Sequence, residues 1–313
     1  MRRPARAFLY PGQGSQAVGM AADLFREDGR FRALIAHAEV LVGRDLRTLC
    51  LRGPEKVLAR TDLLQPLLVA VSLGYHRQLT DRGITPDVVA GHSLGEISAL
   101  AAAGVVTDET AVTLAAWRGE LMQAAAAGMD GGMLAVGTER REEFLGWFAS
   151  SASPGEVVVA NDNAPGQLVL SGRREMLGEL AGRISSEGFG RHRLLDVAGP
   201  WHGPWMVEAR DRFARRARQI PFAPPLIPIL MNATARPAVD PEQIRDLVVG
   251  SLTAPVRWRE VMERLREMAV GTMLEVGPGR VLSGLARQNG FPATTRIFPV
   301  GSLRGVDAAA ASP

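Results

Sequence analysis

Cysteine is almost absent from this chain of 313 residues, because Cys50 is the only one. A single cysteine excludes an internal disulfide bond and a thiolate-rich metal site. We expect Cys50 to be a small buried apolar side chain. The five histidines form no HExxH motif or other close pair of ligands, so the sequence predicts no metal site.

Long apolar runs are also missing. No run reaches about 18 apolar residues, so we expect neither a membrane-spanning helix nor a membrane partner. The basic N-terminus is followed by only about four apolar residues, whereas a secretory signal needs about 7–15. We therefore expect a cytoplasmic protein. A composition of 46% hydrophobic and 22% charged residues is typical of a folded globular chain.

Lysine is as scarce as cysteine, since Lys56 is the only one and arginine supplies the other positive charges. The formal net charge is only +3, and tyrosine occurs twice, so the sequence does not predict nucleic-acid binding. The densest basic segment indicates either a face for an acidic partner or a solvated helix surface. Its members are Arg191, Arg193, Arg210, Arg212, Arg215, Arg216 and Arg218.

Short apolar runs alternate with long helical patterns over most of the chain. This alternation predicts an α/β fold, with βα units around a largely parallel sheet. The apolar runs lie at 7–10, 87–91, 271–277 and 296–301, and the helical patterns at 55–83, 95–126 and 255–269.

Residues 129–199 break this rhythm with the order strand, helix, strand, strand, helix, strand, which is typical of a ferredoxin-like unit. We expect it to be a small subdomain inserted into a large one of residues 1–128 and 200–304. The tail 305–313 is low in complexity and is predicted to be disordered. The expected strands lie at 131–137, 156–163, 167–172 and 191–199, with helices at 139–149 and 173–188.

The sequence GHSLG at 91–95 lies between an apolar strand and an alanine-rich helix. A GxSxG motif in that context predicts a nucleophile elbow, with Ser93 at a sharp strand-to-helix turn. The glycines remove Cβ atoms from the turn, and the N–H groups at the start of the helix favour a developing negative charge. The simpler alternative is a serine that caps the helix.

A serine hydroxyl needs a base, and His202 is the best candidate. It lies in a loop rich in glycine and proline, after the last strand of the inserted unit. Asp196 or a backbone carbonyl would orient its second ring nitrogen, and the residues alone do not choose between them. The other histidines lie in helical stretches or a basic strand, and His92 is expected to point away from Ser93.

Two further features narrow the chemistry. The loop YPGQGSQ at 10–16 follows the first strand and could offer a backbone N–H to an oxyanion beside that of Leu94. Its spacing differs from that of nucleotide-binding loops. Arg118 interrupts an apolar helix, and a buried arginine needs an anion, which is either a protein carboxylate or part of a ligand.

Taken together, these residues resemble the malonyl-CoA:acyl carrier protein transacylases and the acyltransferases of polyketide synthases, including free-standing (trans-acting) enzymes. The resemblance runs from about residue 7 to 301 and rests on ten motifs in order. LVGRDLRTLC at 41–50 and NATARP look more like the free-standing polyketide enzymes. The motifs are PGQGSQ (11–16), QP within 61–66, GHSLGE (91–96), WRGELMQ (117–123), GGMLAVG (131–137), VANDNAPGQLVLSG (159–172), the loop 198–206, NATARP (232–237), APVRW (254–258) and EVGPGRVLSGL (275–285).

The resemblance implies an α/β-hydrolase-like large subdomain and specific roles for individual residues. Ser93 would be the nucleophile and His202 the general base and acid. Gln13 and Leu94 would supply the oxyanion-hole N–H groups, and Arg118 would bind the malonyl carboxylate through two hydrogen bonds. A carbonyl around Ser251 would orient the histidine, at a position where the family usually has glutamine.

The resemblance also implies ping-pong transfer of malonyl from CoA to the phosphopantetheine thiol of an acyl carrier protein, in fatty-acid or polyketide biosynthesis. Carrier proteins are acidic, which gives the arginines of 191–218 a partner. No metal or cofactor is implied, and we expect a monomer.

Departures from the family pattern leave alternatives open. Trp201 and Gly203 flank His202 where the family commonly has phenylalanine or serine before the histidine and serine after it. Trp201 would crowd an α-branched acyl group and favour malonyl, or else reshape the pocket for an unusual one. Three other interpretations stay open. They are a hydrolase that strips acyl groups from carrier proteins, a malonyl-transfer subunit of a malonate decarboxylase, and a catalytically idle carrier-binding module.

Overall fold

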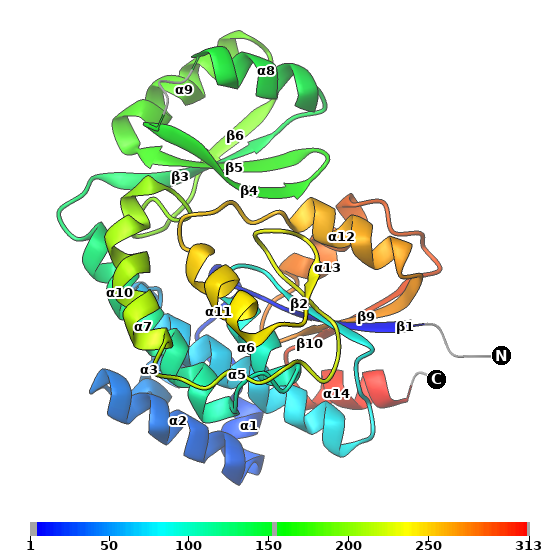
Figure 1. Cartoon of the computed structure of the whole chain (residues 1–313). Coiled ribbons are helices and arrows are strands. Elements are labelled where there is room, and N and C mark those ends of the chain that lie inside the picture. Colours follow the sequence, from blue (N-terminus) through cyan, green and yellow to red (C-terminus); the bar gives the residue numbers. More distant parts are fainter. Residues whose placement is uncertain (1–4, 152–154, 312–313) are drawn as a thin grey trace.

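The computed structural model describes residues 5–151 and 155–311. A six-stranded sheet in the order β10-β9-β1-β2-β7-β8 forms the centre of the large subdomain (Figure 1). Only β8 runs antiparallel to its neighbour. The strands are β1 (Ala5–Tyr10), β2 (Val88–Gly91), β7 (Ile229–Leu230), β8 (Pro237–Ala238), β9 (Val270–Val276) and β10 (Arg296–Val300).

Helices cover both faces of this sheet, so alternate residues of a strand enter different cores. Phe8 and Tyr10 pack with the helices on one face, whereas Ala7 and Leu9 pack with those on the other. The first face carries α1 (Ala22–Glu27), α2 (Gly29–Val42), α3 (Leu46–Arg52), α4 (Glu55–Leu58), α5 (Thr61–Asp81), α6 (Gly95–Ala102), α7 (Asp108–Ala126), α10 (Val207–Ala217), α11 (Pro241–Gly250) and α14 (Leu303–Ala310). The second face carries α12 (Trp258–Glu267) and α13 (Val281–Gln288).

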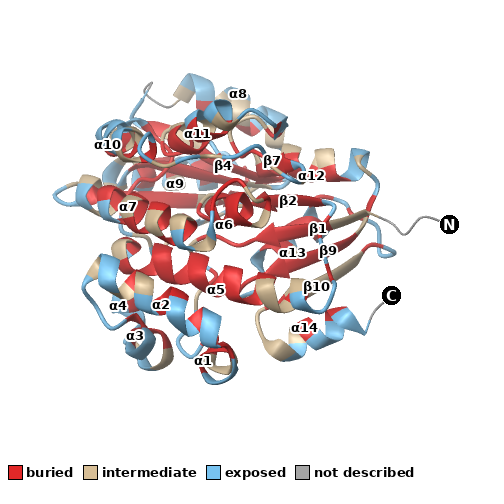
Figure 2. Ribbon diagram, turned by 60° about the horizontal axis from the view of Figure 1, so that its bottom comes forward, coloured by how far each residue is buried: buried red, intermediate tan, exposed pale blue. Residues whose placement is uncertain are grey.

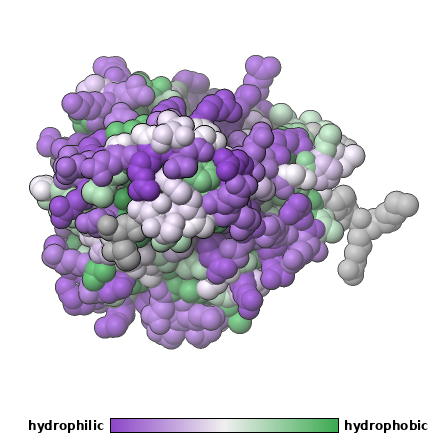
Figure 3. Space-filling model, turned by 90° about the horizontal axis from the view of Figure 1, so that it is seen from above, coloured by the Kyte–Doolittle hydropathy of each residue, from purple (hydrophilic) through white to green (hydrophobic). Residues whose placement is uncertain are grey.

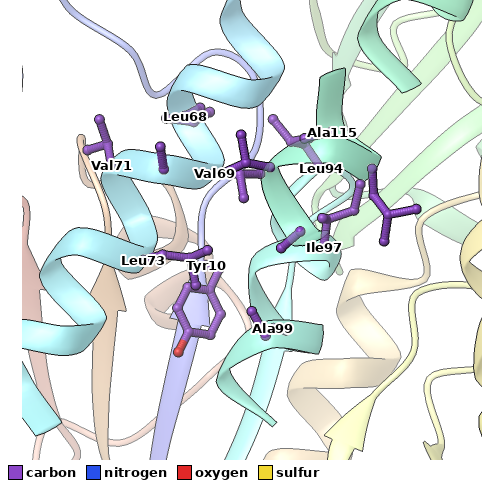
Figure 4. Packing of buried hydrophobic residues seen from close by; sticks show 14 of the residues in the cluster. Tyr10, Leu68, Val69, Val71, Leu73, Leu94, Ile97, Ala99 and Ala115 are labelled. Atoms are coloured by element: carbon purple, nitrogen blue, oxygen red, sulfur yellow. The ribbon is translucent and has the colours of Figure 1, made fainter. Parts of the chain in front are cut away.

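The core that supports the site lies where α5, α6 and α7 meet β1. Figure 4 shows Tyr10 between side chains of α5 and α6, with Leu94 and Ala115 close by. Nearly every residue of α5 from Leu63 to His76 is buried, and the burial pattern of Figure 2 shows this helix at the centre of the molecule. Because apolar contacts surround α6, the start of this helix has little freedom to move.

Between the two sequence segments of the large subdomain lies a second, four-stranded antiparallel sheet in the order β4-β5-β3-β6. Its βαββαβ order confirms the predicted ferredoxin-like unit within 129–199. The helices α8 and α9 cover its outer face, and the other face is turned toward the large subdomain (Figure 1). The elements are β3 (Gly131–Gly137), α8 (Arg141–Ser151), β4 (Val157–Ala164), β5 (Gln167–Arg173), α9 (Arg174–Ser186) and β6 (Arg191–Leu194).

The structure corrects two expectations about helices. The pattern 95–126 is two helices, because Gly104 at φ 74° ends the first and the Thr107 side chain caps the second. The pattern 55–83 likewise divides into α4 and α5.

The predicted disordered tail is wrong for residues 305–310, which belong to α14. Ser302 caps this helix by accepting the Gly305 N–H, and Val306 and Ala309 are buried. Alanine is the best helix former, so the alanine-rich composition favours this helix once an apolar surface is available for it. Residues 312–313 lie outside the described residues. In the part of the chain that is described, no helix is both long and apolar enough to cross a membrane.

Candidate active site

Ser93 lies at the turn between β2 and α6 with φ at 51°, in the left-handed region. Such a conformation costs roughly 1–3 kcal/mol in a residue other than glycine. The flanking glycines make the turn possible: a Cβ at Gly91 would lie 1.9 Å from the carbonyl carbon of Gly95, and one at Gly95 would lie 2.0 Å from the Tyr10 carbonyl oxygen. The predicted nucleophile elbow is therefore present.

His202 lies between β6 and α10, and its buried ring faces Ser93. The Ser93 Oγ and His202 Nε2 atoms are 2.7 Å apart, and His202 Nδ1 is 2.8 Å from the Ser251 carbonyl oxygen. Because a carbonyl can only accept, Nδ1 carries the proton, and Nε2 is free to accept from the serine hydroxyl. Asp196 is exposed, so the Ser251 carbonyl takes the orienting position that the sequence left open.

Arg118 comes from the middle of α7 and is only 1% exposed. Its Nη2 atom donates to Ser93 Oγ at 3.2 Å, and its Nη1 atom donates to Gln65 Oε1 at 3.0 Å. Gln65 in turn donates to Gln13 Oε1 at 3.0 Å. No carboxylate among the described residues forms an ion pair with this buried guanidinium, which leaves it available for the anionic group of a ligand.

Burial and this cation set the protonation of the site. Burial, followed by the charge of Arg118, lowers the pKa of His202 to about 3. Burial also lowers the pKa of Arg118 to about 10, so this side chain stays charged at neutral pH. His202 is therefore a neutral imidazole, the form in which Nε2 can accept a proton.

Two backbone N–H groups face the turn without an acceptor. Within the described residues, neither the Gln13 N–H nor the Leu94 N–H donates a hydrogen bond to the protein. The loop approaches the elbow so closely that a Cβ at Gly12 would lie 2.6 Å from the His92 carbonyl oxygen. These two free donors are therefore the candidates for an oxyanion hole.

A cavity of about 280 Å³ opens over Ser93 between the two subdomains. Trp201, Met122 and Met133 contribute apolar walls, while Asn161 and Asn163 of β4 contribute amides. Larger hollows of about 660 and 720 Å³ lie elsewhere on the surface, and neither is lined by a serine and a histidine. The small subdomain therefore forms the roof of the candidate site.

The arginines of 191–218 are only partly free. Arg210, Arg212 and Arg216 form ion pairs with Asp211, Glu208 and Glu120. Arg193 lines the cavity over Ser93, and Arg191, Arg215 and Arg218 are exposed. Seen from above, the face of the molecule formed by the small subdomain is mainly hydrophilic (Figure 3).

Three buried polar residues of the site were not predicted from the sequence: Gln65, Glu96 and Asn232. Gln65 holds Arg118, whereas Asn232 accepts the Ser93 N–H at 3.0 Å and is itself bonded to Glu96. Each lies within a quoted motif. A polar residue inside an apolar helix, such as Gln65 within LLQPLLVAV, was the available signal, since buried polar groups need partners.

Comparisons with known proteins agree with this geometry. The acyl transferase domain family matches residues 7–292. The malonyl CoA-acyl carrier protein transacylase of Escherichia coli O157:H7 is 36% identical over 285 residues, which are 90% of this chain and 92% of the relative. Polyketide biosynthesis protein ThaF of Burkholderia thailandensis is 37% identical over 283 residues, 90% of this chain but 24% of that protein.

A solved structure of similar shape is a malonyl-transacylase in complex with the holo acyl carrier protein of a type II polyketide synthase. It superposes with a TM-score of 0.92 at 34% identity and covers 99% of this chain and 100% of that one. The family match and these identities extend over nearly the whole molecule. The chain therefore belongs to the acyl transferase domain family, among the malonyl-CoA:acyl carrier protein transacylases.

Proposed function

We propose that this chain moves a malonyl group from coenzyme A to the phosphopantetheine thiol of an acyl carrier protein, through an ester on Ser93. The observation that carries the proposal is the convergence of three side chains: Ser93 and His202 line the cavity, and the buried Arg118 donates to Ser93 Oγ. Ser93 Oγ lies 2.7 Å from a neutral histidine nitrogen and 3.2 Å from the buried guanidinium of Arg118. A carboxylated acyl thioester matches all three groups.

In the first half-reaction, His202 Nε2 takes the proton of Ser93 as Oγ attacks the thioester carbonyl carbon. The Gln13 and Leu94 N–H groups bind the tetrahedral oxyanion. As that intermediate collapses, the carbon–sulfur bond breaks and the CoA sulfur leaves with the proton from His202. The Ser251 carbonyl keeps the histidine ring in the required tautomer throughout.

The second half-reaction runs the same steps with a new thiol. The phosphopantetheine thiol gives its proton to His202 and attacks the serine ester, and Ser93 leaves as the alcohol after taking that proton back. Both half-reactions balance in atoms and electrons without a metal or a redox cofactor.

Selectivity follows from Arg118 and Trp201. Arg118 on its rigid helix would bind the free carboxylate through two hydrogen bonds and orient the thioester over Ser93. Trp201 borders the cavity with 5% of its surface exposed, and we infer that it leaves little room for an α-branch. We therefore expect malonyl to be preferred over branched analogues.

The partner that we propose is an acidic carrier protein, supported by Arg193, which is exposed and lines the cavity, and by the relative solved with its carrier. We propose a free-standing (trans-acting) enzyme, supported by the motifs LVGRDLRTLC and NATARP. We also propose a monomer. A cytoplasmic setting agrees with a single, buried cysteine.

The direct test is intact-mass analysis after the protein is mixed with malonyl-CoA and then with a holo carrier protein. We expect a malonyl adduct that passes to the carrier and is absent from Ser93→Ala. Arg118→Ala should load malonyl about 100-fold more slowly, because a hydrogen bond to a charged group contributes about 1.5–3 kcal/mol. Arg216→Ala, which removes a half-buried arginine that pairs with Glu120 away from the cavity lining, is the matched control and should load normally.

Other outcomes would overturn the proposal. An acylated carrier stripped to free acid, with no adduct from malonyl-CoA, would establish the hydrolase. Carrier binding without any serine adduct would indicate an idle binding module. Transfer restricted to the carrier subunit of a malonate decarboxylase would place the enzyme in that complex.

A further inference from the structure

The side chain of Asn232 forms hydrogen bonds with the backbone of the turn at Ser93. Asn232 lies just after β7, and its Oδ1 atom accepts the Ser93 N–H at 3.0 Å. Its Nδ2 atom donates to the Gly91 carbonyl oxygen at 2.8 Å. A single amide therefore bridges the residues on either side of His92, and one of the two, Ser93, has a left-handed backbone.

The partners fix the orientation of this amide. Ser93 N–H can only donate and the Gly91 carbonyl can only accept, so Oδ1 and Nδ2 cannot be exchanged without losing both bonds. Asn232 is 1% exposed, so lost bonds would not be replaced by water. The Asn232 amide therefore has a single orientation in which both hydrogen bonds to the turn are made.

Glu96 holds the bridge in turn. Its Oε1 atom accepts from Asn232 Nδ2 at 2.7 Å and from the Asn232 backbone N–H at 2.6 Å. Glu96 is 1% exposed, and burial raises its pKa to about 7. Its second oxygen has no hydrogen-bond partner within the described residues. A buried carboxylate with so few partners is costly for a residue that only fills space.

The bridge also decides which N–H groups can meet the substrate. Because Asn232 occupies the Ser93 N–H, the free donors at the elbow are those of Leu94 and Gln13. It also fixes the point from which Ser93 Oγ reaches both His202 and Arg118. Reacting groups displaced by about 1 Å can lose about 100-fold in rate.

We propose that Asn232 and Glu96 are positioning residues that hold Ser93 in its reactive conformation, an inference that rests on the proposed role of Ser93 as nucleophile. The pair acts through the backbone of the turn and does not touch the acyl group. Its loss should slow acylation of Ser93 and leave malonyl-CoA binding nearly unchanged.

The test compares Asn232→Ala, Glu96→Ala and Glu96→Gln in the full chain. Two reactions are measured: loading by malonyl-CoA, and phosphorylation of Ser93 by diisopropyl fluorophosphate, which carries neither a carboxylate nor CoA. We expect both alanine variants to react at least 30-fold more slowly with either reagent, with KM for malonyl-CoA within threefold of wild type. Glu96→Gln keeps an acceptor oxygen and should recover to within about fivefold of wild type.

Asp28→Ala is the matched control. Like Glu96, Asp28 is buried, and its carboxylate accepts the Phe31 backbone N–H and the Gln78 side-chain amide. Unlike Glu96, it lies in the helical layer, far from Ser93 in the sequence and outside the cavity. It should lower the melting temperature as the Glu96→Ala substitution does, yet leave both reactions of Ser93 unchanged.

The proposal is overturned if Asn232→Ala reacts within threefold of wild type, if Glu96→Gln is as slow as Glu96→Ala, or if KM rises while kcat is unchanged. Should Asn232→Ala fail to fold, the two Glu96 variants decide alone. A wild-type chain that reacts with the fluorophosphate but never loads malonyl would refute the proposed function, and the variants would still test the positioning role through the fluorophosphate.

Discussion

The charge of His202 is set by its burial and by one neighbouring cation. It is buried, and the Arg118 guanidinium acts on it in the same direction, so its pKa falls to about 3. Removing that cation should raise the pKa, and binding of a malonyl carboxylate to Arg118 should raise it in the same way. The base therefore becomes stronger when the correct substrate arrives.

We predict that Arg118→Gln raises the pKa of His202. The measurement is an NMR titration of the imidazole Cε1–H signals, which is practical with five histidines, with His202 assigned by its loss in His202→Asn. Arg216→Gln should leave the titration unchanged, because that arginine is bound to Glu120 at the surface. An unaltered His202 titration in Arg118→Gln would show that burial alone sets its charge.

Some residues of the candidate site could be predicted from the sequence, whereas others could not. Ser93 was predictable because a strand-to-helix turn and two glycines leave a signature in adjacent residues. His202 was a candidate because few histidines compete with it. Asn232 and Glu96 were not predictable as a pair, because they are separated by 136 positions and only the sheet order places β7 beside β2.

Among the elements, β4 joins the two subdomains. The Asp162 N–H donates to the Val256 carbonyl oxygen, and the Val256 N–H donates to that of Ala160, so a bridge extends the small sheet to the segment before α12. The Asp162 carboxylate also pairs with Arg141 of the small subdomain and Arg259 of the large one, at 2.8 and 3.1 Å. β4 therefore holds the small subdomain in place over the cavity.

We predict that Asp162→Ala lowers the free energy of unfolding by about 2–3 kcal/mol, because two hydrogen-bonded and largely buried guanidinium groups lose a partner. Urea denaturation measures this loss. Asp211→Ala breaks an exposed pair with Arg210 and should cost less than about 1 kcal/mol. Equal losses in the two variants would mean that the carboxylate does not join the subdomains.

The sequence predicted which segments are helices and which are strands better than it predicted where each one begins and ends. The apolar strands and the βαββαβ order could be predicted from the spacing of apolar residues along the sequence. The end of α6 has a local signal in Gly104 and Thr107, whereas α14 also depends on a tertiary contact, in which the Asp23 carboxylate accepts the Leu303 N–H at 2.6 Å. These two residues are 280 positions apart in the sequence, so no local pattern could reveal that contact.

For the whole molecule, buried titratable groups determine how stability varies with pH. Burial lowers the pKa values of His76 and His202 to about 4 and about 3 from an ordinary 6.5, and it also lowers that of His92. As the pH falls below 6.5, the unfolded chain takes up protons that the folded chain refuses, so stability falls. Glu96 opposes this, because its raised pKa favours the folded state at low pH, an effect lost between about pH 4.5 and 7.

Three histidines outweigh one carboxylate, so we predict that the free energy of unfolding falls on acidification from pH 6 to 5. The slope should be on the order of 1–2 kcal/mol per pH unit. Urea denaturation across this range measures it, and His76→Phe should make the slope shallower. A flat profile would show that these histidines are protonated in the folded protein.

The small subdomain enters and leaves the large one at neighbouring points. A Cβ at Gly131 would lie 2.4 Å from the Pro200 ring, and one at Gly199 would lie 2.6 Å from the Ala126 side chain. A segment whose ends meet can be exchanged as one piece without moving the rest of the fold. Ser93, Arg118 and His202 all lie outside that piece, so the walls that the small subdomain contributes to the cavity can change while the three side chains beneath them stay in place.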